Sequence, residues 1–339
     1  MLVQKSAGLG SGIEDTEYNQ AGASIIETAK EVFDRSDMIM KVKEPLPSEY
    51  DLLKAGQILF TYFHFASSLE LTHAMMERKI ICITYETVQS EDGSLPLLVP
   101  MSEVAGKMAA HIAAYFLALP YGGRGVLMGG VPGVIPAKVV VIGGGTVGAN
   151  AAKVAAGMGA RVTLFDININ RLKHLDDVLP KNITLLVSNQ HSIEEEIKDA
   201  DAVIGAVLIP GAEAPKLMTE DMVKKMKPNS VIVDVAIDQG GCIATSKPTS
   251  HSDPVYKLHN VSHYCVTNMP GAFARTSTFA LTNATLPYGL EIANKGFKKA
   301  LKENKALAKG LNAIEGKITY KPVAKAFNLK YYPVEEVIG

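Results

Sequence analysis

The residues best suited to chemistry form a glycine-rich turn near the middle of the chain. The segment from Lys138 reads KVVVIGGGTVG, in which aliphatic residues precede glycines at positions 143, 145 and 148. The aliphatic run predicts a buried parallel strand, and the glycine spacing predicts a turn that opens a helix. In such a turn Gly143 permits the bend, Gly145 lets backbone N–H groups approach a pyrophosphate, and Gly148 allows close helix–strand packing. We therefore predict a dinucleotide site.

An acidic residue follows at the distance that this motif requires. Asp166 ends a second apolar run, RVTLF, 18 residues after Gly148. Its carboxylate is placed to accept hydrogen bonds from the adenosine ribose, and its negative charge repels a 2′-phosphate. The sequence therefore favours NAD over NADP as the cofactor.

The composition describes a well-buried protein with no strong electrostatic bias. The 339 residues suggest two domains, and the formal net charge of -1 gives no footprint for nucleic acid or for an anionic membrane surface. Cys82, Cys242 and Cys265 show no metal-ligand spacing. No segment has the apolar length of a membrane span. We expect a cytoplasmic enzyme that binds neither metal, nucleic acid nor membrane.

The order of strand and helix signals predicts an α/β fold of two Rossmann-like domains. Both halves alternate between apolar strand patterns and helical patterns, which is typical of parallel sheets covered by helices. Because the first part has too few elements to close a domain, we expect the C-terminal segment to return to it. The expected division is 1–96 for the first part of the substrate domain, 97–274 for the inserted NAD-binding domain with its linking helix, and 275–339 for the return.

Local patterns give the expected elements. Strands are expected at 38–42, 57–63, 79–85, 139–142, 162–165, 184–187, 202–206 and 231–235. Helices are expected at 23–34, from Ser48, at 68–77, 101–118, 151–158, from Ser192, from Thr219, at 290–304 and at 323–327. The alanine-rich surface of the helix at 101–118 suits close packing in a hinge.

Two segments of the first part carry side chains that could act on a substrate. Lys41 and Lys43 in KVKEP lie two residues apart at a strand end, so they share one face. His64 follows a strongly apolar strand, and the carboxyl ends of parallel strands are where ligands bind in open α/β sheets. From the residues alone, a solvated lysine pair and a satisfied interior histidine are also consistent with these patterns.

Two further segments follow the nucleotide-binding strands. In VDVAIDQGG, Asp234 ends a buried strand and Asp238 precedes two glycines, a pattern typical of a backbone shaped around a ligand. One of these acids could instead cap a loop. In TNMPG, Asn268 and Met269 precede a rigid turn, and a packing role is equally consistent with them.

With these segments together, the chain resembles the family that unites alanine dehydrogenase with the alpha subunit of the proton-pumping transhydrogenase. The resemblance covers the whole sequence. It rests on KVKEP, FTYFHFA, YETVQ, PMSEVAG, GGRGVLMGGVPGV, GGGTVG, GAVLIPGAEAPKL, DVAIDQGG and NMPG. It implies reversible, NAD-dependent oxidative deamination of L-alanine to pyruvate and ammonium, by an enzyme that is commonly a homohexamer.

The resemblance also implies roles for individual residues. Lys43 is similar to the lysine that holds the substrate's carboxylate and carbonyl oxygens, His64 to the catalytic acid/base, and Asp238 to the carboxylate that orients water or ammonia. Met101 and Asn268 match substrate-pocket positions. Cofactor contacts are implied for Ser102, Gly143, Gly145, Val147, Gly148, Asp166, Arg171, Ser188, Val207, Leu208, Asp238 and Met269.

One departure from the family leaves alternatives open. Members begin about thirty residues earlier with a segment PxE…RVxxTP, whose arginine forms a charge-assisted pair with the substrate carboxylate. We expect either a start codon upstream of Met1 or a truncated, catalytically impaired NAD-binding paralogue. A saccharopine-type dehydrogenase is a further alternative, against which the strings around Lys43 and His64 argue. A transhydrogenase subunit is another, which would need a docking partner and a membrane protein, whereas the alanine-type strings run through both domains.

Overall fold

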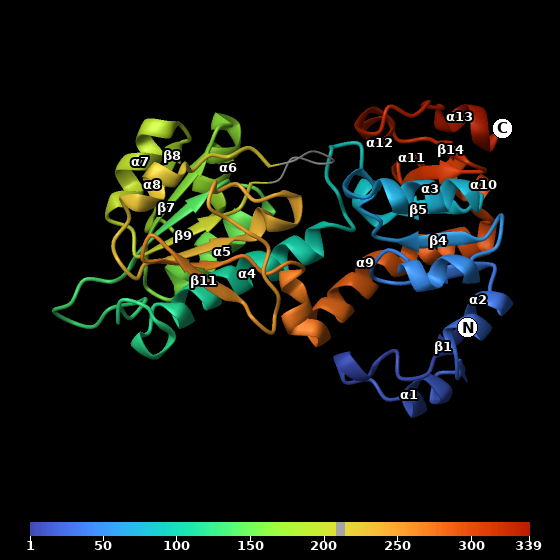
Figure 1. The fold of residues 1–339 in the computed structure, drawn as a ribbon, viewed down its shortest axis with the longest axis horizontal. Helices are drawn as coiled ribbons and strands as arrows, with labels where there is room; N and C mark the ends of the chain where they lie inside the picture. The colour runs from blue at the N-terminus through green and yellow to red at the C-terminus, as the bar shows by residue number, and fades with distance from the viewer. Residues whose placement is uncertain (208–213) are drawn as a thin grey trace. The chain divides into compact units, whose positions relative to one another are not determined.

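The computed structural model describes residues 1–207 and 214–339 (Figure 1). The chain divides into two compact units. Unit 1 consists of Met1–Met101 and Ala274–Gly339, and unit 2 consists of Ser102–Phe273. Each unit has its own sheet covered by helices, so the predicted α/β class is confirmed. No helix within the described residues is both long and apolar enough to cross a bilayer.

Unit 1 is built on a five-stranded sheet in the order β14-β13-β5-β4-β3. Its strands are β3 (Met38–Met40), β4 (Ile58–Thr61), β5 (Ile81–Thr84), β13 (Leu311–Ile314) and β14 (Lys317–Ile318). The first three are parallel, and β13 joins β5 in the antiparallel direction. The C-terminal segment therefore contributes two strands to the sheet that carries Lys43 and His64.

Helices cover both faces of this sheet. On one face, buried side chains come from α2 (Ala29–Arg35), α3 (Leu69–Glu77) and α12 (Lys321–Ala326). On the other face they come from α9 (Ala274–Lys295), α10 (Phe297–Glu303), α11 (Lys305–Ala308) and α13 (Val334–Ile338). A separate parallel pair, β1 (Leu2–Gln4) and β2 (Ser24–Ile26), brackets α1 (Asp15–Gln20).

Unit 2 is built on a seven-stranded sheet in the order β11-β12-β10-β9-β6-β7-β8. Its strands are β6 (Lys138–Ile142), β7 (Arg161–Asp166), β8 (Ile183–Val187), β9 (Ala202–Gly205), β10 (Val231–Asp234), β11 (Val255–Leu258) and β12 (Val261–Tyr264). All are parallel except β11. The chain runs outward from β6 to β8 and then crosses back to β9, so the strand order reverses beside β6. Such a reversal is where ligands bind in doubly wound sheets.

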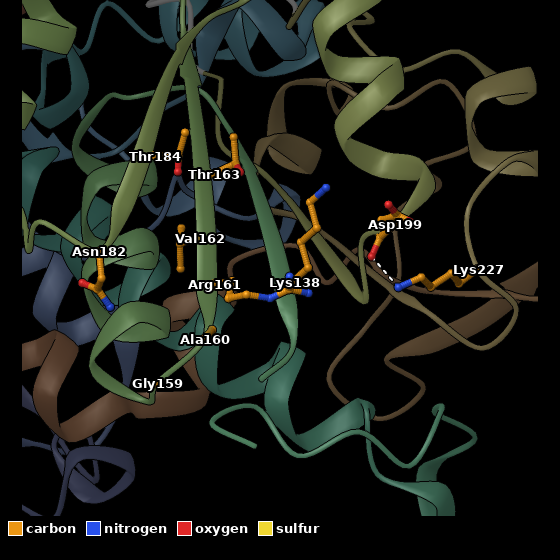
Figure 2. Close-up of a pocket in the computed structure, with 10 residues that line it drawn as sticks. All are labelled: Lys138, Gly159, Ala160, Arg161, Val162, Thr163, Asn182, Thr184, Asp199 and Lys227. Atoms are coloured by element: carbon orange, nitrogen blue, oxygen red, sulfur yellow. Dashed lines mark hydrogen bonds between the residues drawn. The ribbon is translucent and has the colours of Figure 1, made fainter. Parts of the chain in front are cut away.

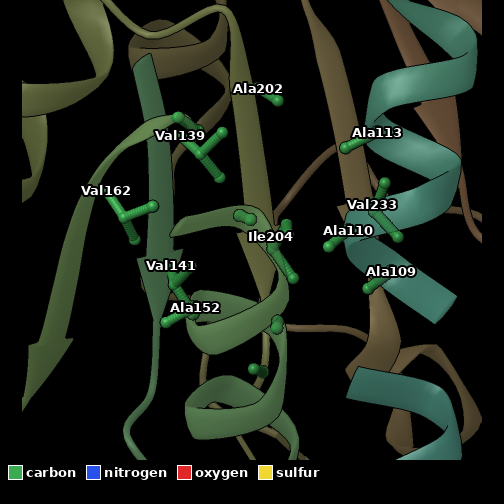
Figure 3. Close-up of a cluster of buried hydrophobic side chains, with 14 of the residues drawn as sticks. Ala109, Ala110, Ala113, Val139, Val141, Ala152, Val162, Ala202, Ile204 and Val233 are labelled. Atoms are coloured by element: carbon green, nitrogen blue, oxygen red, sulfur yellow. The ribbon is translucent and has the colours of Figure 1, made fainter. Parts of the chain in front are cut away.

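Small side chains let the helices of unit 2 approach the sheet closely. On one face lie α4 (Val99–Phe116), α5 (Thr146–Gly157) and α6 (Ile169–Val178), and on the other lie α7 (Gln190–Lys198) and α8 (Glu220–Lys224). Figure 3 shows Ala109, Ala110 and Ala113 of α4 in the buried cluster with Val233 of β10. The alanines that the sequence assigned to a hinge are thus core residues of unit 2.

Two predicted helices of unit 1 take a different form. The segment at 23–34 begins as strand β2, and its helix begins only at Ala29, because the Thr28 hydroxyl caps it by accepting the Glu31 N–H at 3.2 Å. The segment from Ser48 is a short 3-10 helix over Pro47–Leu52, not an α-helix. Its cap comes from the Glu49 carboxylate, which accepts the Leu46 N–H at 2.8 Å.

Two other helix boundaries were also predicted wrongly. Helix α7 is capped by Asn189, whose side chain accepts the Ser192 N–H at 2.8 Å, and Ser192 itself lies inside the helix. The long helix predicted at 290–304 begins already at Ala274 and breaks at Gly296, which has a φ of 74°. A left-handed backbone at Gly296 ends α9 and starts α10.

Candidate functional site

The three glycines of the unit 2 turn have three different surroundings. Gly143 has a φ of 107°, a backbone conformation that side chains disfavour. A Cβ on Gly148 would lie 1.7 Å from the Gly143 carbonyl oxygen, so only glycine lets α5 sit this close to β6. Around Gly145, by contrast, a Cβ would meet no atom within 4 Å. The turn is therefore closed by packing at Gly148 and open to a ligand at Gly145.

The helix that follows presents its amino end beside this opening. Helix α5 begins at Thr146 with Gly145 as its N-cap, and no side chain caps it. The first N–H groups of a helix have no partner within the helix, and they carry partial positive charge. A phosphate at Gly145 would satisfy them. The turn therefore fits the pyrophosphate of a dinucleotide.

Asp166 connects the end of β7 to the glycine turn. Its Oδ2 accepts the Gly144 N–H at 2.8 Å and its Oδ1 accepts the Asn168 N–H at 2.8 Å. The Arg171 Nε donates to the Gly144 carbonyl oxygen at 2.7 Å, which places the guanidinium beside the same turn. The Ser188 N–H donates to the Asp166 carbonyl oxygen at 2.9 Å. Each carboxylate oxygen retains a lone pair for a ribose hydroxyl.

The two acids after β10 have opposite surroundings. Asp234 is fully buried, and its carboxylate accepts the N–H groups of Ala236, Cys242 and Ile243 and the Ser246 hydroxyl. Asp238 is exposed. Asp234 therefore holds the loop in shape, which the sequence could not tell, whereas the Asp238 carboxylate lies at the surface.

Asp238 lies against the other predicted segment of unit 2. Its Oδ1 accepts the Asn268 N–H at 3.1 Å. Asn268 is exposed with a left-handed φ of 53°, while Met269 next to it is buried. The His251 Nε2 lies 3.2 Å from the Asn268 carbonyl oxygen. The structure thus brings Asp238 and Asn268 into contact and assigns Met269 to the core.

In unit 1 the predicted substrate residues follow neighbouring strands. Met40 of β3 pairs with Phe60 of β4, so the segments that carry Lys43 and His64 leave the sheet side by side. The Thr61 hydroxyl donates to the Lys43 carbonyl oxygen at 2.9 Å. Within the described part of the chain, the half-buried Lys43 ammonium makes no hydrogen bond or ion pair.

The neighbouring lysine is occupied. Lys41 forms an ion pair with Glu49, and both side chains are mostly buried. The two lysines of KVKEP therefore differ in their surroundings: a carboxylate holds Lys41, whereas the Lys43 ammonium has no partner among the described residues.

Sequence reasoning missed one residue at this edge. Glu86 follows β5, the strand beside β4, and its Oε1 accepts the N–H groups of Phe63 at 3.1 Å and of His64 at 2.7 Å. The signal was available, because Glu86 lies after a parallel strand as Lys43 and His64 do. His64 is half-buried with a left-handed φ of 51°.

The remaining predicted positions lie as follows. Met101 and Ser102 are half-buried residues in the first turn of α4, and Val147 and Val207 are half-buried beside the glycine turn. Leu208 lies outside the described residues. Among the described residues, no group of three or more His, Cys, Asp or Glu is arranged to hold a metal ion.

A pocket of about 540 Å³ opens at the opposite end of the unit 2 sheet (Figure 2). Its lining includes Lys138 and Arg161, which begin β6 and β7, and Lys227. Lys138 pairs with Glu196 at 3.1 Å, and Lys227 donates to the Asp199 carbonyl oxygen at 2.6 Å. Because Lys138 and Lys227 already have partners and ligands of such sheets bind at the carboxyl ends, we do not place the site here.

Comparison with known proteins decides the family. Residues 1–105 match "Alanine dehydrogenase/PNT, N-terminal domain", and residues 109–321 match "Alanine dehydrogenase/PNT, C-terminal domain". The chain belongs to the alanine dehydrogenase/PNT family. Membership of this family and the nucleotide-binding fold of unit 2 imply an oxidoreductase with a nicotinamide cofactor and a small-molecule substrate.

Within the alanine dehydrogenase/PNT family, the chain is more similar to alanine dehydrogenases than to a transhydrogenase. It is 59% identical to an alanine dehydrogenase of Methanococcus maripaludis, over 100% of this chain and 91% of that protein. A solved L-alanine dehydrogenase matches with a TM-score of 0.92 at 49% identity, covering 96% of this chain and 90% of the other. A transhydrogenase from Sinorhizobium meliloti matches with a TM-score of 0.77 at 26% identity, covering 94% and 90%.

Proposed function

We propose that this protein catalyses the reversible, NAD-dependent oxidative deamination of L-alanine to pyruvate and ammonium. The observation that carries the proposal is the placement of Lys43 and His64 at one sheet edge of unit 1, where neither the ammonium nor the ring nitrogens have a hydrogen-bond partner among the described residues. The glycine turn of unit 2, which has room for a phosphate at Gly145, supports a dinucleotide as the cofactor. The identity to alanine dehydrogenases over the whole chain supports alanine as the substrate.

Lys43 is proposed to bind the substrate's carboxylate and carbonyl oxygens. The Thr61 hydroxyl fixes the backbone of Lys43 by donating to its carbonyl oxygen, and the ammonium makes no competing ion pair within the described residues. A fixed positive charge beside the carbonyl stabilises the oxyanion character that develops when water or ammonia adds to the carbonyl carbon. This interaction grows along the reaction, so it contributes to rate as well as to binding.

His64 is proposed to move the proton at the reacting oxygen and nitrogen. An imidazole is suited to this role because it exchanges protons near neutral pH. Neither ring nitrogen of His64 has a partner in the described structure, so both are available to substrate or water. Asp238 is proposed to orient the water or ammonia, as an exposed carboxylate fixed by the Asn268 N–H.

The residues of the unit 2 turn are proposed to hold NAD. Gly143, Gly145 and the amino end of α5 would bind the pyrophosphate, and Asp166 would bind the adenosine ribose. The negative charge of Asp166 supports NAD over NADP. When bound, NAD would supply the hydride acceptor for the oxidation of the substrate. Ser102, Arg171 and Ser188 are proposed as further cofactor contacts, whereas Met269, whose side chain is buried in the core of unit 2, is left out of the proposal.

We further propose that the chain forms a homo-oligomer, with a hexamer as the expected form. The segment after α4 exposes several large apolar side chains in unit 2. These are Leu119, Leu127, Val131, Val134 and Ile135, exposed by 70%, 66%, 53%, 62% and 69%. An apolar surface of this kind is typical of a protein–protein contact. Light scattering of the purified protein measures the assembly directly.

The function is tested by adding L-alanine and NAD to the purified protein and following NADH absorbance. The proposal predicts NADH in equal amount to pyruvate and ammonium, and consumption of NADH when pyruvate and ammonium are supplied. D-alanine, saccharopine and NADP serve as controls that should give little or no reaction. NADH binding without turnover would instead support the impaired paralogue.

A further inference from the structure

Glu86 makes contacts that the proposed reaction does not use. It lies in the single 3-10 turn Tyr85–Thr87 that follows β5. Its Oε1 accepts two consecutive backbone N–H groups, from Phe63 at 3.1 Å and from His64 at 2.7 Å, and its Oε2 lies 3.4 Å from the Phe63 nitrogen. Within the described residues, Glu86 forms no ion pair. Its charge is therefore directed at the backbone of the segment that carries His64.

The backbone that Glu86 holds is in an unusual conformation. His64 has a φ of 51° and a ψ of 38°, which is left-handed and is sparsely populated by residues other than glycine. Such a conformation persists only where neighbouring groups fix it, and it is often found where a side chain must point in a given direction. The His64 carbonyl oxygen is also held, because it accepts the Ser67 N–H at 2.9 Å and the Ser67 hydroxyl at 2.7 Å.

The ring of His64 is supported on one face and free at its nitrogens. It is nearly parallel to the Tyr62 ring, with 6.0 Å between centroids and 14° between planes. Tyr62 is itself fixed, because its hydroxyl donates to the Leu97 carbonyl oxygen at 2.5 Å. Hydrogen bonds therefore hold the backbone of His64, and the Tyr62 ring supports one face of its imidazole. The two ring nitrogens remain available to a substrate.

We propose that Glu86 is a positioning residue, which holds His64 in the left-handed conformation that aims its imidazole at the substrate. The inference rests on the proposed role of His64 as the acid/base. Glu86 acts as a hydrogen-bond acceptor for the backbone and exchanges no proton with the substrate. An alternative is that Glu86 is itself the titrating catalytic group, and the two possibilities predict different behaviour for the Gln variant.

The test compares Glu86→Gln with Glu86→Ala. The glutamine carbonyl oxygen can take the place of Oε1 and accept both N–H groups, whereas alanine accepts neither. We expect Glu86→Ala to lower kcat about 100-fold, the effect of moving a reacting group by roughly 1 Å. The KM for L-alanine and the Kd for NADH should stay within about threefold, since Lys43 and the unit 2 turn are unchanged. Glu86→Gln should keep kcat within about tenfold of the wild type.

The pH profile of kcat/KM separates positioning from proton transfer. If Glu86 only positions His64, kcat/KM of both variants changes with pH over the same range as in the wild type. Only the maximum value of kcat/KM is lower. If Glu86 exchanges the proton, Glu86→Gln is as inactive as Glu86→Ala, and kcat/KM of both variants loses the pH dependence seen in the wild type. That result overturns the proposal. Glu70→Gln, an exposed acid in the first turn of α3 with no hydrogen bond among the described contacts, is the matched control and should behave as the wild type.

Hydrogen exchange measured by mass spectrometry gives a readout that does not depend on activity. In the wild type, the amides of Phe63 and His64 should exchange slowly because Glu86 accepts both hydrogens. In Glu86→Ala these two amides should exchange at least tenfold faster, while the β4 amides before them are unchanged. Unchanged exchange in that variant overturns the inference even if the protein oxidises alanine. If these amides exchange slowly in the wild type and faster in Glu86→Ala, but the wild type oxidises no alanine, the proposed function fails while the hydrogen bonds of Glu86 stand. Fast exchange in the wild type itself would overturn the inference.

Discussion

The carbonyl oxygen of Gly143 occupies the space that a side chain on Gly148 would need, since a Cβ built there lies 1.7 Å from it. Gly148→Ala should therefore push α5 away from β6 and lower the free energy of unfolding by roughly 1–3 kcal/mol. Gly145→Ala should leave the stability almost unchanged, because its φ of −65° suits alanine and no atom lies near the new Cβ. It should weaken NADH binding about tenfold or more by filling the phosphate position.

Gly157→Ala in the last turn of the same helix is the matched control. Its Cβ would meet nothing within 4 Å, so it should raise stability by about 0.5–1 kcal/mol and leave NADH affinity unchanged. Chemical denaturation and NADH fluorescence titration measure the two quantities. Equal affinity of Gly145→Ala and the wild type would contradict the placement of the pyrophosphate.

Asp166 carries the predicted discrimination between NAD and NADP. Asp166→Asn removes the negative charge and keeps an oxygen that can accept the Gly144 N–H, so the turn should survive. The repulsion of a 2′-phosphate should fall, while the nearby Arg171 guanidinium remains as a partner for it. We expect the ratio of kcat/KM for NADP to that for NAD to rise at least about tenfold. An unchanged ratio would count against the ribose contact.

Lys43→Met removes the free ammonium and keeps most of the side-chain volume. Because the charge is proposed to bind the carboxylate and the developing oxyanion, kcat/KM for L-alanine should fall about 10²–10³-fold. NADH binding should be retained, since the cofactor contacts are in unit 2. Lys30→Met, which breaks an exposed pair with Asp34, is the control and should change neither quantity. Full activity of Lys43→Met would show that another group holds the substrate.

His64→Asn tests the acid/base without disturbing the backbone. Asparagine tolerates the left-handed conformation that position 64 adopts, so the fold should be retained. Loss of the proton-transfer group should lower kcat by about 10²–10⁴-fold. His73→Asn, on the exposed side of α3, should behave as the wild type. Steady-state kinetics measures kcat of both variants. Retained turnover in His64→Asn would refute the assignment of His64 as the acid/base.

The buried His263 predicts how the stability of unit 2 depends on pH. Burial lowers the pKa of His263 below its ordinary value of 6.5, and the neutral ring lies between the Thr245 hydroxyl and the Val261 carbonyl oxygen. A lowered folded-state pKa means that the unfolded chain binds the proton more readily. This contribution to stability is thus complete above pH 6.5 and is lost as the pH falls below 6.5 and through the folded-state pKa.

Thermal unfolding of the wild type and of His263→Gln at pH 8 and pH 5 measures this dependence. The variant should be less stable at pH 8, and its Tm should fall less between the two values because it lacks the titrating ring. Equal pH dependence of the two proteins would mean that His263 does not titrate on unfolding.

The sequence predicts correctly those parts of the fold that depend on short, local residue patterns. The run at Val139–Ile142 and the glycines after it determine a strand, a turn and a helix within a few residues, and the structure has all three. The hairpin of β11 and β12 was missed. Its two-residue turn is formed by His259 and Asn260, both with positive φ, and the glycine that normally marks such a turn is absent.

The sequence predicts those site residues that directly follow an apolar strand, because each such position can be recognised from its own segment. Lys43 and His64 each follow an apolar strand, and the pairing of β3 with β4 brings their segments together. Asp234 and Asp238 differ because Asp234 accepts hydrogen bonds from residues as distant in the sequence as Ser246. No local sequence pattern shows such contacts. The position of Glu86 after a parallel strand could have been read from the sequence, but its contacts to the backbone of Phe63 and His64 could not.

The transfer of deuterium from L-alanine labelled at Cα tests the central claim most directly. With NAD and purified protein, the account predicts that the label appears at C4 of the reduced nicotinamide and not in solvent. It also predicts that this transfer is slowed at least about 100-fold in Lys43→Met and in His64→Asn. A wild type that binds NADH but transfers no label, or that releases the label to water, would contradict the account.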